Sequence, residues 1–380
     1  MPGKRRGNGE GTITQRPDGT WRGSLTLPDG RRKDFRAKTQ EEARRTLTRL
    51  TRERDQGALM RSDERLTVEA FLLGWLERRK PHLRMSSRAR YAEHVAHIIR
   101  ALGKVRLAKL TANHVERMYA QLLDSGLSGS SVAQAHTILK STLKDAMRKR
   151  ILSVNVCEMV ETPHASHREI HPLDETQANA FLLAARGERR FEALFILALR
   201  TGMRQGELLA LHWQDVDLER GTLLVRLSLR RLKGGGYEFN QPKTKAGRRT
   251  ITLTPTVIDA LKAHRVEQNK DRLFLGPAWQ DNDLVFPSTI GTPQDAAHLA
   301  TIILRRVLDN AELPRIRFHD LRHTCATLLL LRGIDANTVK DLLGHSNITI
   351  TLGTYGHVLP NMRDRVAEMM DAILAPSTAG

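Results

Sequence analysis

A tyrosine lies between two glycines near the end of this 380-residue chain, in the stretch LGTYGHV at 352–358. Tyrosine is usually a packing residue whose hydroxyl finds a hydrogen bond. The flanking glycines argue against that role, because they remove neighbouring side chains and permit loop conformations. A phenol on a flexible segment can also be a nucleophile, provided that other groups bind the atom it attacks. Tyr355 is therefore a candidate for either role.

The charge of the chain indicates what such a nucleophile would attack. Lys and Arg number 61 against 42 Asp and Glu, which gives a formal net charge of +19. An excess of this size predicts a polyanionic partner. Residues 1–61 contribute strongly, with 16 basic and 8 acidic side chains and a net charge of +8. The sequence has no phosphate-binding loop of the P-loop type, so no use of ATP is expected.

Several other classes of function are disfavoured. Cys157 and Cys325 show neither a disulfide framework nor metal-ligand spacing, and both are expected to be buried apolar residues. The histidines of the polar segment 161–172 lack the cysteines or carboxylates of a metal cage, so no metal is expected. No apolar run reaches 18 residues and no signal peptide begins the chain, which predicts a cytoplasmic protein without membrane contact.

Four segments together resemble the catalytic domain of the tyrosine recombinases, the phage integrase family. They are TGMRQGELLAL (201–211), PKTKAGRRTITL (242–253), HDLRHTCATLLL (319–330) and LGHSNITITLGTYGHV (343–358). Each segment by itself is unspecific. Their order is specific, as is the position of the tyrosine ten residues after the histidine of LGHS.

The resemblance implies that Arg204 and Arg322 hold the scissile phosphate of a DNA strand. A planar guanidinium binds two phosphate oxygens at once, which suits the charge that phosphoryl transfer places on them. The alternative for each arginine is a structural ion pair, of Arg204 with Glu207 and of Arg322 with Asp320. Two arginines in matching motifs favour the phosphate role.

The same resemblance makes Lys243 the general acid that protonates the departing 5′ oxygen. Lys245 remains the alternative acid, because it would face the same side of a strand. His319 and His345 would assist proton transfer or donate a hydrogen bond to a phosphate oxygen.

Tyr355 is then the nucleophile, and its attack gives a 3′-phosphotyrosine that conserves the phosphodiester energy without ATP, metal or other cofactor. The glycines at 353 and 356 fit a segment that must move into and out of the site. His323 and His357 fall outside the matched positions, so we interpret them as packing or surface residues.

The elements that position these residues define the expected fold, which is multidomain. Residues 173–380 predict a mixed, mainly α catalytic domain, with helices at 174–188 and 191–202 and short strands at 221–228 and 248–253. Its last helix, 361–374, carries an apolar stripe that could dock on a neighbouring protomer or pack on its own domain.

Two further domains are expected before it. Residues 62–160 predict an all-α unit of four helices, which resembles the family's SAM-like, core-site DNA-binding domain. Residues 1–61 predict a small β-sheet of three strands plus a helix, with hairpin turns at Asp18-Gly19 and Asp29-Gly30. This part resembles the arm-site DNA-binding domain of larger integrases, and the polar residues 161–172 are expected to be a linker.

The sequence therefore predicts a nucleoid-associated, site-specific recombinase that integrates, and can excise, a phage or other mobile element. The resemblance implies core and arm sites on double-stranded DNA and a homotetramer, and it leaves room for a DNA-bending host factor and a directionality factor. The alternatives are a type IB topoisomerase, a chromosome-dimer resolvase and a catalytically silent DNA-binding regulator. The basic N-terminal domain argues against the first two, and the complete set of matched residues argues against the third.

Overall fold

The computed structural model describes residues 11–27, 30, 32–55, 65–83, 85–163, 171–232, 234–242, 245–355 and 370. The chain forms two compact units, Met1–Arg168 and Glu169–Gly380. The point of division lies inside the segment predicted to be a linker. The finer boundaries of the four predicted parts, including a separate domain at 1–61, stay predictions.

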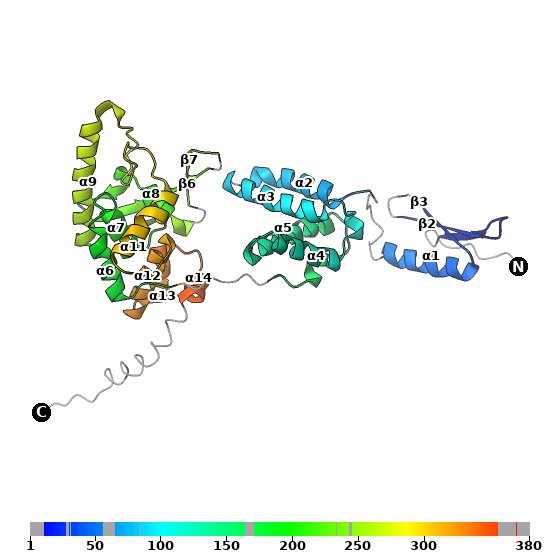
Figure 1. Cartoon of the computed structure of the whole chain (residues 1–380). Helices are drawn as coiled ribbons and strands as arrows, with labels where there is room; N and C mark the ends of the chain where they lie inside the picture. The colour runs from blue at the N-terminus through cyan, green and yellow to red at the C-terminus, as the bar shows by residue number, and fades with distance from the viewer. Residues whose placement is uncertain are drawn as a thin grey trace. The chain divides into compact units, whose positions relative to one another are not determined.

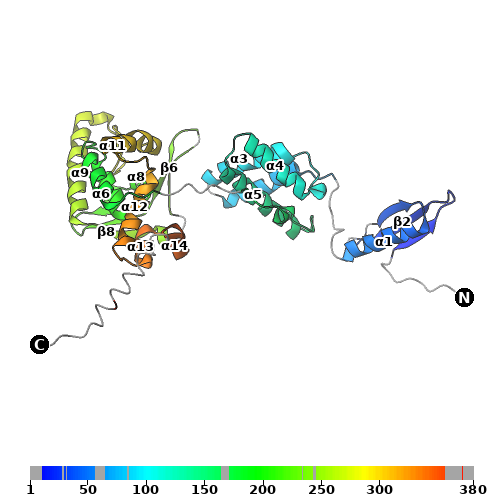
Figure 2. The same ribbon diagram turned by 60° about the horizontal axis from the view of Figure 1, so that its bottom comes forward.

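The first unit begins with a three-stranded antiparallel sheet and a helix, as predicted. The elements are β1 (Thr12–Gln15), β2 (Trp21–Thr26), β3 (Arg32–Ala37) and α1 (Gln40–Asp55), and the strand order is β1-β2-β3. Figure 2 shows α1 lying along this sheet, where Leu25 of β2 and Leu50 of α1 are buried. Thr39 Oγ1 accepts a hydrogen bond from the backbone N–H of Glu42 at 3.2 Å, which caps the amino end of α1.

The rest of the described part of the first unit is mainly helical, and the four predicted helices are confirmed. They are α2 (Val68–Arg79), α3 (Met85–Leu102), α4 (Ala112–Asp124) and α5 (Gly129–Arg148), with short 3₁₀ turns η1 (Lys80–His82), η2 (Leu107–Lys109) and η3 (Val156–Met159). The bundle encloses its own core, in which Tyr119 and Cys157 are buried.

The described part of the second unit is mainly helical and carries two small sheets (Figure 1). Its helices are α6 (Glu175–Ala185), α7 (Glu192–Thr201), α8 (Gln205–Leu209), α9 (Pro255–Leu275), α10 (Ala296–His298), the π-helical turn η7 (Leu299–Ile303), α11 (Leu304–Asn310), α12 (Phe318–Leu331), α13 (Ala336–Leu343) and α14 (Ile348–Tyr355). Further 3₁₀ turns are η4 (Trp213–Asp215), η5 (Lys245–Gly247) and η6 (Gly276–Ala278).

The strands of the second unit only partly follow the prediction. One sheet has the order β4 (Val216–Asp217), β5 (Thr222–Val225), β8 (Arg249–Thr252), and the other pairs β6 (Ser228–Arg231) with β7 (Tyr237–Asn240). The two expected strands correspond to β5 and β8. The other three strands were missed: β4 has only two residues, too few for an alternating pattern, and the four-residue strands β6 and β7 were not predicted.

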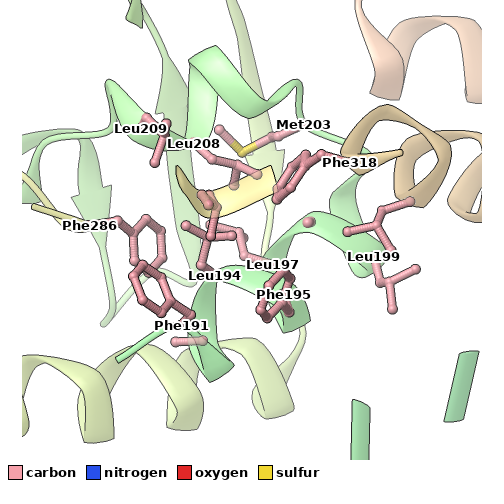
Figure 3. Close-up of a cluster of buried hydrophobic side chains, with 14 of the residues drawn as sticks. Phe191, Leu194, Phe195, Leu197, Leu199, Met203, Leu208, Leu209, Phe286 and Phe318 are labelled. Carbon is pink, nitrogen blue, oxygen red and sulfur yellow. The ribbon is translucent and has the colours of Figure 1, made fainter. Parts of the chain in front are cut away.

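Helix α7 is the centre of the second core. Apolar side chains from several of its faces are buried, which is typical of a helix surrounded by other elements (Figure 3). The ring of Phe195 packs edge-on against Phe181 of α6, with centroids 5.3 Å apart, and lies 6.2 Å from Phe318 of α12. This packing holds the carboxyl end of α7 close to the amino end of α12, where the predicted site residues lie.

Two predictions concern parts of the chain that are only partly described. In the ranges given above, no helix has the length and apolar character that crossing a bilayer would require. Of the expected C-terminal helix at 361–374, only Met370 belongs to the described residues, so its docking mode stays a prediction.

Candidate active site

Five of the six predicted catalytic residues lie among the described residues, at the ends of four helices. Arg204 directly precedes α8, and His319 and Arg322 lie in the first turns of α12. His345 follows the end of α13, and Tyr355 is the last residue of α14. The sixth, Lys243, lies outside the described residues, between β7 and β8.

Arg322 ties two turns of the chain together. Its side chain is buried, with 2% of the residue exposed. Nη1 donates a hydrogen bond to the carbonyl of Gly202 at 2.8 Å, and Nη2 donates to the carbonyl of Leu343 at 2.7 Å. These carbonyls lie two residues before Arg204 and His345, so a single guanidinium positions both residues.

The alternative partner considered for Arg322 is engaged elsewhere. Asp320 accepts hydrogen bonds from the Arg317 side chain, at 2.8 Å from Nη2 and 3.1 Å from Nε. The alternative interpretation, an ion pair between Arg322 and Asp320, is therefore wrong. Burial, then the charge of Arg204, lower the pKa of Arg322 to about 9, so the group remains cationic at neutral pH. A guanidinium has more N–H donors than two carbonyls use, so Arg322 can also bind an anion.

Glycines make both turns possible. Gly202 and Gly344 end α7 and α13 in the left-handed region, with φ of 61° and 67°. A Cβ atom would lie 2.5 Å from Leu343 Cδ2 at the first position and 2.8 Å from the Ala246 carbonyl at the second. Only glycine combines this backbone with such close approach. The helices can thus stop abruptly and direct Arg204 and His345 toward one place.

Glu207 links two arginines. Its Oε1 accepts a hydrogen bond from Arg204 Nη1 at 2.8 Å, and its Oε2 accepts one from Arg249 Nη2 at 3.0 Å. The alternative ion pair of Arg204 with Glu207 is thus present, yet 39% of the Arg204 side chain stays exposed and can reach a ligand. Burial would raise the pKa of Glu207, but Arg249 and Arg204 together hold it below its usual value. The carboxylate therefore remains charged and orients both guanidinium groups.

Arg249 is a site residue that the sequence analysis missed. Besides Glu207, it binds the carbonyl of Leu342, which accepts from Nε at 2.6 Å. It thereby joins β8 to the end of α13. The three arginines Arg204, Arg249 and Arg322 face a single carboxylate in this part of the described structure, so the site has a surplus of positive charge. Such a surplus favours a bound anion.

The two predicted histidines respond to the same arginines. Burial, then His323 and Arg322, lower the pKa of His319 to about 4, although the residue as a whole is partly open to solvent. Burial, then Arg322 and Arg204, lower the pKa of His345 to about 4. Both imidazoles are therefore neutral at pH 7. The shared influence of Arg322 shows that the tertiary structure brings these two histidines to one cationic centre.

Tyr355 is buried, contrary to the expectation of a flexible glycine segment. Gly353 lies inside α14. This helix begins after Asn347, and Asn347 Oδ1 accepts a hydrogen bond from the N–H of Thr349 at 3.0 Å. A glycine inside a helix lowers the stability of that helix by about 1 kcal/mol relative to alanine, whereas burial of a large apolar side chain stabilises the fold by roughly 1.5–3 kcal/mol. Burial of the Tyr355 ring therefore offsets the cost of Gly353. Only 2% of Tyr355 is exposed, and burial raises its pKa to about 12. The phenol is therefore neutral at pH 7. Gly356 lies outside the described residues.

His323 contacts the phenol directly, and the interpretation of it as a packing or surface residue missed this contact. Its Nδ1 lies 2.7 Å from Tyr355 Oη, within hydrogen-bonding distance. Its ring also meets the ring of His319 edge-on, with centroids 4.9 Å apart. The signal in the sequence was the spacing of four residues in HDLRH, which places both histidines on one face of a helix.

Three other residues with potentially reactive side chains belong to the same unit. Lys245 begins the 3₁₀ turn η5 and not a strand, so the argument that it shares a strand face with Lys243 does not hold. Tyr237 lies in β7 and packs against the core. Cys325 is buried as predicted, and burial raises its thiol pKa to about 12, which makes it unreactive.

Comparison with known proteins gives consistent matches. Residues 171–362 match the model of the phage integrase family, and residues 67–123 match that of the phage integrase N-terminal SAM-like domain. An integrase of Saccharopolyspora erythraea is 28% identical, with 96% of both chains covered. A XerC-like tyrosine recombinase of Caldanaerobacter subterraneus is 32% identical over 70% of this chain and 72% of the relative.

Solved structures show the same fold. The Tn1549 transposon integrase, in complex with transposon right-end DNA, has a TM-score of 0.69 at 22% identity and covers 80% of this chain and 100% of its own. A lambda integrase tetramer bound to a Holliday junction has a TM-score of 0.58 at 18% identity, with 92% and 96% covered. The second match extends to most of the chain, including residues before the helical bundle.

Proposed function

Because the chain belongs to the phage integrase family, and is thus a site-specific DNA recombinase that breaks and rejoins strands, we propose that its six matched residues form one catalytic site. These residues are Arg204, Lys243, His319, Arg322, His345 and Tyr355. The observation that carries the proposal is the buried guanidinium of Arg322, which binds the turns of Arg204 and His345 and leaves the site with excess positive charge. Relatives named integrase do not favour the topoisomerase, resolvase or silent-regulator alternatives.

The proposed reaction uses each group for one task. Arg204 and Arg322 bind the non-bridging oxygens of the scissile phosphate, and His345 and His319 donate hydrogen bonds to that group. Tyr355 Oη attacks the phosphorus, a new O–P bond forms, and the bond from phosphorus to the 5′ oxygen breaks. Lys243 gives its proton to the departing oxygen. The 5′ hydroxyl of a partner strand then reverses these steps, so exchange needs no ATP.

Covalent trapping tests the proposal as a whole. The substrate is a core-site duplex, identified by mapping the junctions between the element and the chromosome, with a nick that lets the cleaved end diffuse away. We expect a protein–DNA adduct that survives denaturant and disappears on proteolysis. Tight binding without any adduct would instead support a DNA-binding regulator.

Replacing Lys243 by alanine is expected to slow cleavage of an ordinary strand by about 10²–10⁴-fold. Cleavage of a strand with sulfur at the 5′ leaving position should slow far less, because a thiolate departs without a proton. Single-turnover rates on the two substrates measure the difference. Lys245→Ala is the matched control, for which both substrates should behave as with the wild type. If Lys243→Ala slows both substrates equally, Lys243 is a phosphate contact and not the acid.

We infer that the helical bundle holds the core DNA through a basic surface at the ends of α2 and α5. Asp145 is 8% exposed and binds the ammonium of Lys149 at 2.8 Å and the guanidinium of Arg78 at 3.5 Å. The guanidinium of Arg79 stacks over the Trp75 ring, 5.3 Å from its centroid. One carboxylate thus organises several cations around a hollow of about 430 Å³. Phosphate contacts of this kind give affinity without reading sequence.

The quaternary arrangement we propose is a homotetramer on two DNA duplexes. Its support is the fold shared with the lambda integrase tetramer, which was solved on a Holliday junction. In this arrangement residues 62–160 bind core sites, residues 173–380 perform catalysis, and residues 1–61 bind arm sites. A DNA-bending host factor and a directionality factor would act on such an assembly at the nucleoid.

Removal of residues 1–61 is expected to abolish integration while cleavage of isolated core sites continues. The segment has a net charge of +8 and none of the six matched residues. A tethered second site raises the local concentration of the first, so its loss weakens assembly and not chemistry. Arm binding should also be steeply salt-dependent, with log affinity falling by about 0.9 per phosphate contact per log unit of salt.

Footprinting of full-length and truncated protein on the attachment region, at two salt concentrations, measures the loss of arm protection. The truncated protein should protect only core sequences. If both proteins protect the same sequences and recombine equally well, residues 1–61 are not an arm-binding domain.

A further inference from the structure

We propose that His323 is a further catalytic residue, the general base that accepts the phenolic proton of Tyr355 during strand cleavage. The assignment rests on the proposed role of Tyr355 as the nucleophile. His323 lies outside the six matched residues, and its role follows from its contact with the reacting oxygen.

The contact between the two side chains has the geometry of a proton transfer. Nδ1 of His323 lies 2.7 Å from Tyr355 Oη, which satisfies the reach required of a general base. The ring centroids are 5.5 Å apart, and the two residues are only 8% and 2% exposed. In the proposed step the neutral phenol donates its proton, so Nδ1 is the acceptor. The imidazole proton then resides on Nε2.

The charges around His323 keep it in the form that accepts a proton. Burial lowers its pKa, Asp320 acts in the opposite direction, and Arg317 and Arg322 lower it further. The edge of the His319 ring completes the surroundings on α12, and Tyr355 faces it from α14. At pH 7 the imidazole is therefore neutral and retains a lone pair on Nδ1. Asp320 would stabilise the imidazolium that forms when the proton arrives.

The other two histidines of the site are suited to a different task. The pKa values of His319 and His345 are lowered by burial and by the cationic centre of Arg322 and Arg204. A neutral imidazole beside these arginines can donate a hydrogen bond to a phosphate oxygen. His323 lies one helical turn beyond His319 on the same face of α12, where the phenol is bound. The two tasks are thus divided between neighbouring histidines.

The proton balance closes over a full cycle. As Tyr355 Oη forms its bond to phosphorus, its proton moves to Nδ1 of His323, while Lys243 protonates the 5′ oxygen that leaves. In rejoining, the 5′ hydroxyl of the partner strand attacks and its proton returns to Lys243. The phenolate then leaves phosphorus and recovers its proton from the His323 imidazolium. No oxidant, reductant or external acid is needed.

The test compares His323→Asn with His323→Phe. Asparagine places an oxygen near the position of Nδ1 and can accept a hydrogen bond, but it cannot carry a proton, whereas phenylalanine does neither. On the nicked core-site substrate, both variants should lose about 10²–10⁴-fold in single-turnover cleavage, the usual contribution of general base catalysis. Their affinity for the substrate should match that of the wild type.

The pH profile separates a base from a residue that only positions the phenol. In the wild-type protein, cleavage should fall as pH drops through the His323 pKa, which lies below the ordinary 6.5, because protonation removes the acceptor. This limb should be absent in His323→Asn. A fluorinated tyrosine at position 355 has a more acidic phenol, so it should lose less activity when His323 is replaced.

His264→Asn is the control for the loss of a buried histidine in the same unit. His264 is 8% exposed and bonds the carbonyl of Val285 at 2.7 Å. This variant should melt at a lower temperature yet cleave at the wild-type rate at 25 °C. A wild-type rate and unchanged acidic limb in His323→Asn would overturn the assignment. If Tyr355→Phe is inactive in that case, the proposed function stands and only the role of His323 fails; an active Tyr355→Phe protein would refute both.

Discussion

The Tyr355→Phe protein is expected to form no covalent complex with DNA, while its affinity for the core site stays within about twofold of the wild type. Only the hydroxyl is lost, and phosphate contacts elsewhere provide the affinity. The ring should keep its place, because it packs in a small apolar cluster with Ala326, Leu330, Val339 and Leu343. Denaturing gels of the trapped adduct and native gels of the bound complex measure the two quantities.

The same substitution at Tyr237 is the control. Tyr237 lies in β7 and packs against the core, so Tyr237→Phe should form the adduct at the wild-type rate. The Tyr355→Phe protein also loses the hydrogen bond to His323, which should lower the free energy of unfolding by about 1 kcal/mol. An adduct formed by Tyr355→Phe would transfer the nucleophile to another residue, with Tyr237 examined first.

The second large effect is expected for Arg322→Lys, which should reduce the cleavage rate by at least about 10³-fold. Removal of a single oxyanion donor already reduces the rate of an enzyme by about 10²–10³-fold. Lysine retains a positive charge but lacks the planar fork, so it cannot bind both carbonyls and a phosphate. A carbonyl of Gly202 or Leu343 would lose its partner, which shifts the turns of Arg204 and His345. Burial would also favour the neutral amine.

Arg332→Lys provides the matched comparison at the carboxyl end of the same helix. Arg332 follows the last residue of α12, and its side chain is 70% exposed where it pairs with Glu175. Exposed ion pairs contribute little to stability, so this variant should cleave and melt like the wild type. Single-turnover cleavage and thermal unfolding of both variants measure the contrast. Equal cleavage by Arg322→Lys and wild type would show that the guanidinium is not a phosphate ligand.

Much of the local structure could be predicted, because its signals lie within a few residues. The helices of the first unit follow from apolar spacing and from caps such as Thr67, whose side chain accepts from the N–H of Ala70 at 3.2 Å. The sheet of β1 to β3 follows from short alternating runs separated by turn residues. Burial of Cys325 follows from its apolar neighbours in a helix. The two-residue strand β4 is too short to carry such a signal.

By itself, the sequence determined the family, and it predicted a polyanionic partner and six site residues, five of which belong to the described structure. The tertiary structure alone decided which atoms those residues touch. Arg322 reaches a carbonyl 120 positions away, and His323 meets a phenol 32 positions further along the chain. Arg249 joins the site through Glu207 and Leu342, and Tyr355 is enclosed in an apolar cluster. The physical reason is that hydrogen bonding and burial depend on distance in space, which periodicity and spacing along the chain do not encode.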